Sequence, residues 1–393
     1  MSEKNYKFQW AQLLTLTAIH FLIDMTGGML PALLPKIREK FGLTLTAGVA
    51  ILTVLNIACN LGQILTGHTR ATKTNPLLLP LGLFLSASLC WIAVVSQSAT
   101  AFAILNVIVV VTGVGIAIMH PESLRAIHGL DKISPAMSTA VFMSGGFIGF
   151  ASGGLVATSL VSWLGWSGMF FILISPAVGI SLIKLFKIRL AVENDSARSS
   201  VDPEQNRYPF SLVMAMAIPL AAGSTILIAL LPTRLAEFGF TLVFGGYPAL
   251  LLGVGAAVGS FFWAAVANRK GALVSSIIAL LTGLPFLIAY LALIKFQVAI
   301  ILLFATGFCS TAAYPMVVTM ARHAVGFNLG RRMGFIVGGS WGAGSVILML
   351  VTFIAEKFGM TVQHILLTTP VCYLLSAIIA IVLMRKNYAS VVD

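Results

Sequence analysis

Charged side chains are scarce in this sequence. Only 9% of its 393 residues are Asp, Glu, Lys or Arg, and just 12 of these are acidic, whereas soluble domains carry roughly 25% charged residues. Hydrophobic residues make up 59% of the chain, and the mean hydropathy is +1.00. This composition excludes a soluble globular domain and indicates an integral membrane protein surrounded by lipid.

Cysteine is also rare, and clustered chemical groups are absent. The four cysteines, at 59, 90, 309 and 372, lie inside apolar runs without the spacing of metal ligands. The six histidines are scattered, and no glycine-rich loop ends in Lys-Ser or Lys-Thr. We therefore expect no disulfide, metal site or cofactor, and neither an enzyme nor an ATP-driven pump.

Long apolar runs fill most of the chain. A helix needs roughly 20 apolar residues to cross a hydrocarbon core of about 30 Å. Runs of this kind predict spans at 9–34, 45–67, 77–96, 101–119, 135–160, 167–186, 209–231, 243–267, 272–294, 297–319, 333–355 and 364–384. The predicted fold is therefore an all-α membrane protein with twelve transmembrane helices.

One polar segment divides these spans into two groups of six. Residues 187–208 (KIRLAVENDSARSSVDPEQNRY) form the longest polar stretch and fall between the sixth and seventh spans. We expect an N-terminal six-helix bundle at 1–186, a cytoplasmic linker at 187–208 and a C-terminal six-helix bundle at 209–393.

The basic residues are distributed unevenly between the segments on the two sides of the membrane. Although the net charge is +12, the lysines and arginines stand singly or in pairs, unlike a nucleic-acid-binding stripe. With a cytoplasmic N-terminus, 18 of the 24 fall in cytoplasmic segments. This bias predicts a multi-pass protein of the bacterial inner membrane with both termini in the cytoplasm. We expect a monomer that binds no nucleic acid.

The two groups of spans also repeat each other. The pattern LLPxxxxxFGxTL occupies residues 33–45 and recurs at 230–242. The pattern FxxGGxxG occupies residues 142–149 and recurs at 335–342. Two pseudo-symmetric six-helix halves joined by a linker are typical of the major facilitator superfamily, in which the substrate path runs between the halves.

Glycines in the repeat recur along one helix face. Gly145, Gly149 and Gly153 are spaced four residues apart, and Gly338 and Gly342 repeat this spacing. Small residues at this spacing let helix backbones approach closely in lipid. We predict that these glycines pack helices against one another.

Asp24 is the acidic residue that lies well inside an apolar span. An ionised carboxylate at such a depth costs about 2.5 to 3.5 kcal/mol on insertion scales. His20 precedes it by four residues, so the two side chains share a helix face and can exchange a proton. We predict a proton-coupling pair; the alternative is that Asp24 only hydrogen-bonds a neighbouring helix.

Other polar residues mark a possible cavity and gate. In the second span Asn56, Asn60 and Gln63 form a stripe that either lines the substrate cavity or holds helices together. Weaker cavity candidates are Asn106, Ser224, Thr225, Tyr314, Ser340 and Trp341. At the end of the fourth span, His120, Glu122 and Arg125 predict either an inner gate or a solvated helix cap.

Three of these motifs together resemble one branch of the superfamily. HFxxD at 20–24, HPES at 120–123 and GGxxG at 145–149 are similar to the fosmidomycin-resistance transporters of the major facilitator superfamily. The resemblance implies a proton-driven exporter with twelve helices. It also implies that the pair His20 and Asp24 and the pair His120 and Glu122 are working residues.

The function predicted from the sequence is secondary active transport by alternating access. The leading hypothesis is proton-coupled antiport, with efflux of a small molecule or drug and a role in antibiotic resistance. The alternatives are a proton symporter or facilitator that imports a small organic solute, and a membrane receptor that does not transport. A single proton-binding acid serves either direction of transport, so the sequence does not choose between them.

Overall fold

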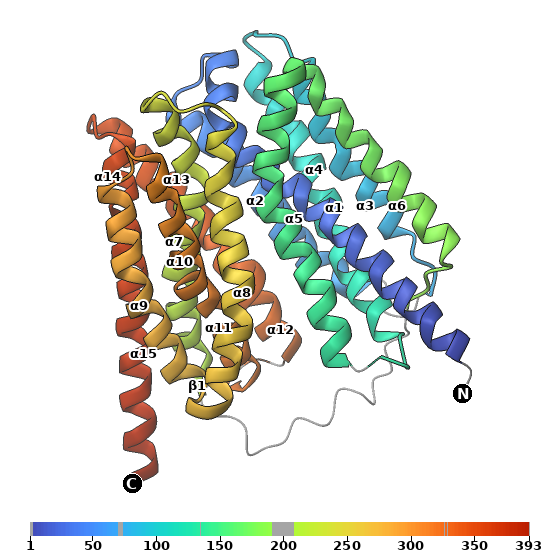
Figure 1. Cartoon of the computed structure of the whole chain (residues 1–393), viewed down its shortest axis with the longest axis vertical. Helices are drawn as coiled ribbons and strands as arrows, with labels where there is room; N and C mark the ends of the chain where they lie inside the picture. The colour runs from blue at the N-terminus through green and yellow to red at the C-terminus, as the bar shows by residue number, and fades with distance from the viewer. Residues whose placement is uncertain are drawn as a thin grey trace. The chain divides into compact units, whose positions relative to one another are not determined.

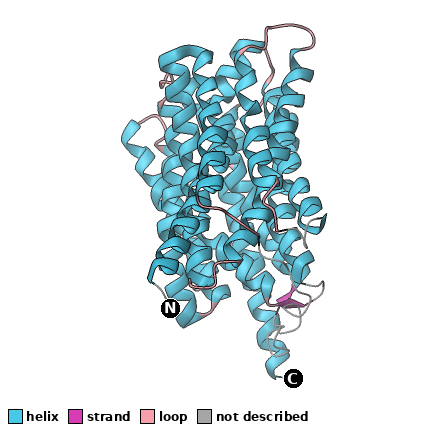
Figure 2. Ribbon diagram, turned by 90° about the vertical axis from the view of Figure 1, so that its right-hand side faces the viewer, coloured by secondary structure: helices cyan, strands magenta, loops and turns pink. Residues whose placement is uncertain are grey.

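Helices make up nearly all of the computed structural model, which describes residues 3–69, 74–133, 135–190, 208–325, 327 and 329–392. Figure 2 shows the predominance of helix and the small β-bridge. In lipid every backbone N–H and C=O must be bonded within the protein, and helices meet that need internally. The apolar stretches of the chain are therefore helical.

The N-terminal part of the chain forms helices α1 to α6, three of which adjoin a 3-10 helix: α3 continues into η1, and η2 joins α5 to α6 (Figure 1). Their bounds are α1 (Glu3–Phe41), α2 (Leu45–Thr69), α3 (Leu78–Ser86), η1 (Ala87–Ala93), α4 (Ala101–His128), α5 (Pro135–Leu164), η2 (Gly165–Leu173) and α6 (Ile174–Leu185). α4 runs through Pro121, so the motif at 120–123 lies inside a helix.

The helices of the C-terminal part are interrupted more often by short 3-10 and π-helical segments. Its elements are β1 (Tyr208–Pro209), α7 (Phe210–Glu237), η5 (Phe244–Gly246), α8 (Tyr247–Lys270), α9 (Ala272–Ala292), η6 (Gln297–Ile300), α10 (Ile301–Cys309), η7 (Thr311–Ala313), α11 (Tyr314–Arg322), β2 (Ala324–Val325), α12 (Leu329–Gly334), η8 (Phe335–Gly339), α13 (Ser340–Lys357), α14 (Val362–Leu366) and α15 (Thr368–Val392). β1 and β2 pair in parallel.

These helices provide twelve membrane crossings. Ten stretches of the described chain are long and apolar enough to span a membrane. One of them, Met137–Leu185, contains both α5 and α6, and the shorter apolar stretch Leu78–Ala93 supplies α3 and η1. The predicted all-α, twelve-helix membrane fold is confirmed.

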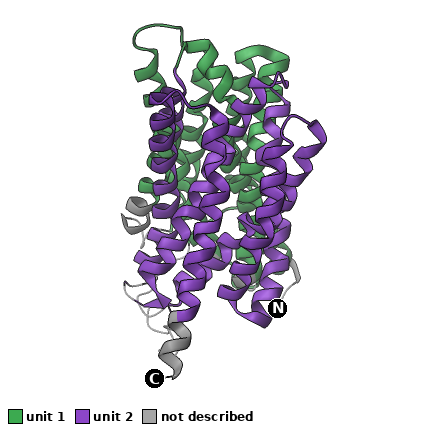
Figure 3. Ribbon diagram, turned by 90° about the vertical axis from the view of Figure 1, so that its left-hand side faces the viewer, with its two compact units in different colours: residues 1–43, 54–199 green, residues 44–53, 200–393 purple. Residues whose placement is uncertain are grey.

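The chain divides into two compact units (Figure 3). Unit 1 comprises residues 1–43 and 54–199, and unit 2 comprises residues 44–53 and 200–393. In unit 1, α1 packs most extensively against α5; in unit 2, α7 packs against α13 and α15, and α8 against α10. Residues 191–207, most of the linker predicted from the sequence, lie outside the described residues.

The first sequence repeat corresponds to a repeated helix ending. Gly42 and Gly239 follow α1 and α7 with φ of 63° and 79°, a conformation that glycine adopts without strain. The N–H of Leu43 bonds the carbonyl of Arg38 at 3.0 Å, and the N–H of Phe240 bonds that of Leu235 at 3.1 Å. Both helices end in the same Schellman motif, so the two units share local structure as well as sequence.

The second repeat marks an irregular helix in unit 2. Residues 335–339 form a π-helix between α12 and α13. There the Ile336 carbonyl accepts hydrogen bonds from the Tyr314 hydroxyl at 2.8 Å and from the Ser340 hydroxyl at 2.5 Å. Single turns of π-helix are frequent at functional sites, and side-chain donors stabilise this one.

Candidate functional site

A half-buried carboxylate in unit 1 contacts two histidines. The Asp24 carboxylate on α1 places Oδ2 3.1 Å from Nε2 of His20 and Oδ1 3.1 Å from Nε2 of His120 on α4. The side chains are 19%, 3% and 18% exposed, respectively. We call His20, Asp24 and His120 the triad; it joins the predicted proton-coupling pair to one residue of the predicted gate.

The second nitrogen of each histidine is held by the backbone. Nδ1 of His20 lies 2.9 Å from the carbonyl oxygen of Phe142, and Nδ1 of His120 lies 2.7 Å from that of Ile116. A carbonyl oxygen only accepts hydrogen bonds, so each Nδ1 carries the proton and donates it. Nε2 is therefore the nitrogen whose protonation can change, and in both rings it faces Asp24.

α5 forms one wall of the triad. The His20 ring stacks on Phe142 with centroids 4.1 Å apart. A Cβ added at Gly146 would lie 2.5 Å from Nε2 of His20 and 2.6 Å from Oδ2 of Asp24. Real Cβ atoms do not approach other atoms so closely, so the site requires glycine at 146.

Neighbouring glycines bring α5 against the α1 backbone. A Cβ at Gly145 would lie 2.6 Å from the carbonyl oxygen of Thr17, and one at Gly149 would lie 2.8 Å from Cα of Phe21. A Cβ at Gly153 would meet the backbone of Gly28 at 2.9 Å. In unit 2, Gly338 is buried, whereas Gly342 has no atom within 4 Å of an added Cβ.

Glu122 and Arg125, the other two residues of the predicted gate, are buried on α4, with exposures of 2% and 6%. Oε2 of Glu122 accepts a hydrogen bond from the backbone N–H of Leu78 at 2.8 Å, at the start of α3. Glu122 therefore connects α4 to α3 instead of projecting into solvent.

The predicted cavity residues bond within their own helices. The Asn60 amide donates to the Asn56 carbonyl at 2.8 Å, and Gln63 donates to the sulfur of Cys59 at 3.4 Å. Asn106 donates to the carbonyl of Phe102 at 2.8 Å. In unit 2, the structure brings the rings of Tyr314 and Trp341 to a centroid distance of 5.3 Å.

The triad is also the group, among the described residues, whose ligand atoms lie close enough together for a metal ion, all within 4.8 Å of one another. This group is not predictable from the residue spacing, because His120 is remote from Asp24 along the chain. The direct contacts of 3.1 Å between nitrogen and oxygen have the length of hydrogen bonds. Each contact therefore has the length to hold one hydrogen bond between a histidine nitrogen and an Asp24 oxygen.

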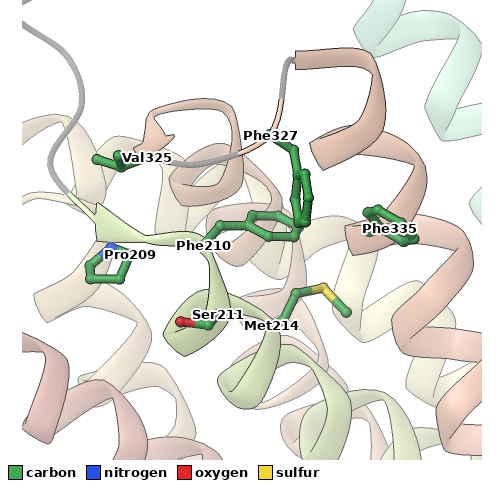
Figure 4. Close-up of a pocket in the computed structure, with 7 residues that line it drawn as sticks. All are labelled: Pro209, Phe210, Ser211, Met214, Val325, Phe327 and Phe335. Carbon is green, nitrogen blue, oxygen red and sulfur yellow. The ribbon is translucent and has the colours of Figure 1, made fainter.

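Unit 2 contains an apolar pocket of about 730 Å³ (Figure 4). Phe210, Met214, Phe327 and Phe335 line it, and the Phe327 ring lies 5.9 Å from that of Phe210 and 5.6 Å from that of Phe335. Its lining offers aromatic and aliphatic contacts and no titratable group. The pocket therefore differs in chemical character from the triad, whose three side chains all carry titratable groups.

Comparison with known proteins assigns the chain to a family. The family model for the Major Facilitator Superfamily matches residues 16–271. The chain belongs to the major facilitator superfamily. Members are secondary transporters, so the chain is a multi-pass membrane transporter and the predicted family is confirmed.

Two bacterial relatives of this superfamily member are similar in sequence. The uncharacterized MFS-type transporter YfnC of Bacillus subtilis is 23% identical over 362 residues, which cover 87% of this chain and 86% of the relative. The fosmidomycin resistance protein of Escherichia coli is 24% identical over 165 residues, 42% of this chain and 40% of the relative. The second relative is a fosmidomycin resistance protein, and the motifs HFxxD, HPES and GGxxG resemble that branch of the superfamily.

Two solved structures share the fold. A bacterial homolog of the human lysosomal transporter Spinster has a TM-score of 0.72 at 15% identity, with 99% of both chains covered. A POT family transporter in complex with a thioalcohol-conjugated peptide has a TM-score of 0.71 at 13% identity, with 96% of both chains covered. Both support the superfamily fold of the chain.

Proposed function

We propose that this superfamily member is a proton-coupled antiporter that exports a small molecule by alternating access. The observation that carries the proposal is the contact of the Asp24 carboxylate with both His20 and His120 inside an apolar bundle. Ionised carboxylates are rare at this depth and mark proton relays in many membrane transporters. Asp24 would be the coupling residue, and the two histidines would share its protons.

The triad links proton binding to helix movement. Asp24 and His20 lie on the same helix, but His120 lies on α4. A proton between Asp24 and His120 bonds α1 to α4, and its loss removes that bond. Binding and release of protons would then favour different arrangements of these two helices, as alternating access requires.

Efflux is the proposed direction. It is supported by the similarity to the fosmidomycin resistance protein over 42% of the chain and by the HPES and HFxxD motifs. Resistance by export needs an energy source, which inward proton movement supplies. The proposed exchange is one in which protons enter as the substrate leaves.

The proposed setting is the bacterial inner membrane, with both termini in the cytoplasm and the chain acting as a monomer. The bias of lysine and arginine toward the predicted cytoplasmic segments supports this orientation. The proposed domain organisation is a bundle at 1–186, a linker at 187–208 and a bundle at 209–393.

Tyr314 and Trp341 are the proposed substrate contacts in the C-terminal half, with Asn56, Asn60, Gln63 and Asn106 in the N-terminal half. Tyr314 occupies the position before Pro315 that His120 occupies before Pro121. Its neutral hydroxyl and the adjacent Trp341 ring suit hydrogen bonding and stacking. A small amphipathic molecule would use both.

The proposal is tested in everted membrane vesicles that hold a respiration-generated pH gradient. Fosmidomycin, other phosphonates, cationic drugs, sugars and organic acids are added in turn while a fluorescent dye reports the gradient. An exported substrate should dissipate the gradient only in vesicles that contain the protein. A compound that moves in the same direction as protons, or binds without any flux, would overturn the exchange proposal.

A further inference from the structure

We propose that the triad binds two protons, one in each contact between a histidine nitrogen and an Asp24 oxygen, and that loss of either proton opens the corresponding contact. The inference deepens the proposed proton-coupled function and rests on it for its meaning in transport. The number of protons bound is a property of the triad alone and can be measured without transport.

The hydrogen bonds at Nδ1 determine the tautomer of each triad histidine. Carbonyl oxygens of Phe142 and Ile116 accept from Nδ1 of His20 and His120 at 2.9 and 2.7 Å. Each neutral ring therefore has its single proton on Nδ1 and an unshared electron pair on Nε2. Neither neutral ring can donate to Asp24.

Each of the two contacts with Asp24 needs a proton of its own. Asp24 uses a different oxygen for each histidine, at 3.1 Å in both cases. Without an added proton, an electron pair of each nitrogen faces one of the carboxylate, which is repulsive at that distance. One added proton joins only one of the two pairs. Both contacts form together only when two protons are present.

Residues of α5 and α2 surround the triad. α5 contributes Phe142 and Gly146 to the triad, and neither titrates. α2 contributes Cys59, whose thiol interacts with the charge of Asp24 and is bonded by Gln63. Within the described residues, the two histidines are therefore the cationic partners that bond Asp24.

Other helices packed on α1 place their titratable groups toward its ends. Lys184 belongs to α6, whose end meets α1 where Gln12 bonds the Phe186 carbonyl. Cys90 belongs to η1, which meets the other end of α1 where Lys40 bonds the carbonyl of Ile92. On α4, Glu122 lies beyond His120 and bonds the backbone of α3. Proton exchange at the triad therefore involves its own three side chains.

The two protons have different mechanical consequences. The proton between His20 and Asp24 joins two residues of α1, whereas the proton between His120 and Asp24 joins α4 to α1. Stacking on Phe142 holds the His20 ring in addition. Release of the His120 proton frees α4 from α1, whereas release of the His20 proton leaves the joining of the two helices unchanged.

The test is nuclear magnetic resonance of the full-length protein in lipid nanodiscs without substrate. Only the histidines are labelled with nitrogen-15. His20→Gln and His120→Gln variants assign the two triad signals. His364 is a matched internal reference, because its Nδ1 accepts the backbone N–H of Thr361 at 3.2 Å. Its neutral ring therefore has the opposite tautomer, with the proton on Nε2.

The expected result is that both triad rings carry two ring protons at acidic pH and that each loses its Nε2 proton as the pH rises. That change amounts to two protons per chain, with Nδ1 protonated throughout. In Asp24→Asn the amide itself donates to one nitrogen, so the count should fall to one. If only one ring changes, or either neutral ring has its proton on Nε2, the proposal is overturned.

These results separate the inference from the proposed function. A chain that binds two protons but shows no exchange of protons for substrate would contradict antiport and leave the count intact. A chain that couples transport to protons but releases only one from the triad would contradict the count and leave antiport intact.

Discussion

His120 on α4 and Asp24 on α1 meet through Nε2 and Oδ1 at 3.1 Å, and this contact ties two helices together at a buried acid. The second carboxylate oxygen bonds His20 on the same helix as Asp24. A proton that enters or leaves the first contact therefore changes how two helices are joined. Protonation at the Asp24 carboxylate can therefore control whether α1 and α4 move together or apart.

Gly146→Ala should abolish the response of transport to a pH gradient. The added methyl would overlap Nε2 of His20 and Oδ2 of Asp24. These are the ends of side chains that can swing away, so the melting temperature should fall little while the triad opens. The measurement is gradient-driven transport in proteoliposomes alongside thermal unfolding.

Gly339→Ala is the matched control, because residue 339 repeats the place of 146 in the FxxGGxxG pattern. The nearest atom to an added Cβ there is 3.7 Å away, an ordinary contact. Gradient-driven transport should stay within about twofold of wild type, a change of roughly 0.4 kcal/mol. Equal losses in both variants would show that glycine is needed at these positions for a reason unrelated to the triad.

Gly149→Ala should destabilise the protein. An added Cβ would lie 2.8 Å from Cα of Phe21, and backbone cannot move aside as a side chain does. Overpacking of this kind costs about 1–3 kcal/mol, so the melting temperature should fall clearly.

Gly342→Ala provides the comparison for Gly149→Ala. Open space surrounds an added Cβ at 342, and alanine favours a helix over glycine by about 1 kcal/mol. Its melting temperature should equal or exceed that of wild type. A Gly149→Ala protein as stable as Gly342→Ala would refute the close approach of α5 to α1.

The sequence predicted the fold well because its signals are local or repeated. Apolar length determined the spans, and the LLPxxxxxFGxTL repeat predicted two related helix endings that the structure shows as matching Schellman motifs. The four-residue spacing of His20 and Asp24 placed both on one helix face, as the structure has them.

The rest of the triad depends on tertiary packing. No local rule brings His120 to Asp24, and the carbonyl that fixes the His20 tautomer belongs to Phe142 on α5, which is remote along the chain. The carbonyl that fixes the His120 tautomer is local, because Ile116 lies one turn earlier on α4. The π-helix at 335–339 was likewise missed, since its Ile336 carbonyl accepts a hydrogen bond from Tyr314 on another helix. The break before Tyr314 was missed too. The alignment of His120-Pro121 with Tyr314-Pro315 was the available clue that these positions matter.

Asp131→Asn should remove a pH-dependent part of the stability at the α4–α5 loop. Hydrogen bonds from Lys132 and from Gln9 hold the pKa of Asp131 below its ordinary value. A lowered folded-state pKa stabilises the fold above the unfolded-state pKa, about 3.9, and this contribution is lost as the pH falls through the folded-state pKa.

Thermal unfolding between about pH 7 and pH 3 checks this expectation. Wild type should melt above Asp131→Asn at neutral pH, and the difference should shrink below about pH 4. A difference that does not vary with pH would show that the bonds to Asp131 do not depend on its charge.

Metal removal should leave the protein unchanged. The ligand atoms of the triad lie within 4.8 Å of one another, but we propose that protons, and not a metal ion, occupy their contacts. Treatment with EDTA should alter neither the melting temperature nor gradient-driven transport. A loss of transport that zinc restores would instead identify the triad as a metal site.

The central claim is that Asp24, bonded to His20 and His120, couples transport to protons. The most direct measurement compares pH-gradient-driven transport by wild type, Asp24→Asn and His364→Asn in proteoliposomes, with folding verified by gel filtration. Transport by wild type and His364→Asn should rise with the gradient. Asp24→Asn should lose at least about tenfold, equivalent to about 1.4 kcal/mol. An Asp24→Asn protein that responds to the gradient as wild type does would contradict the account.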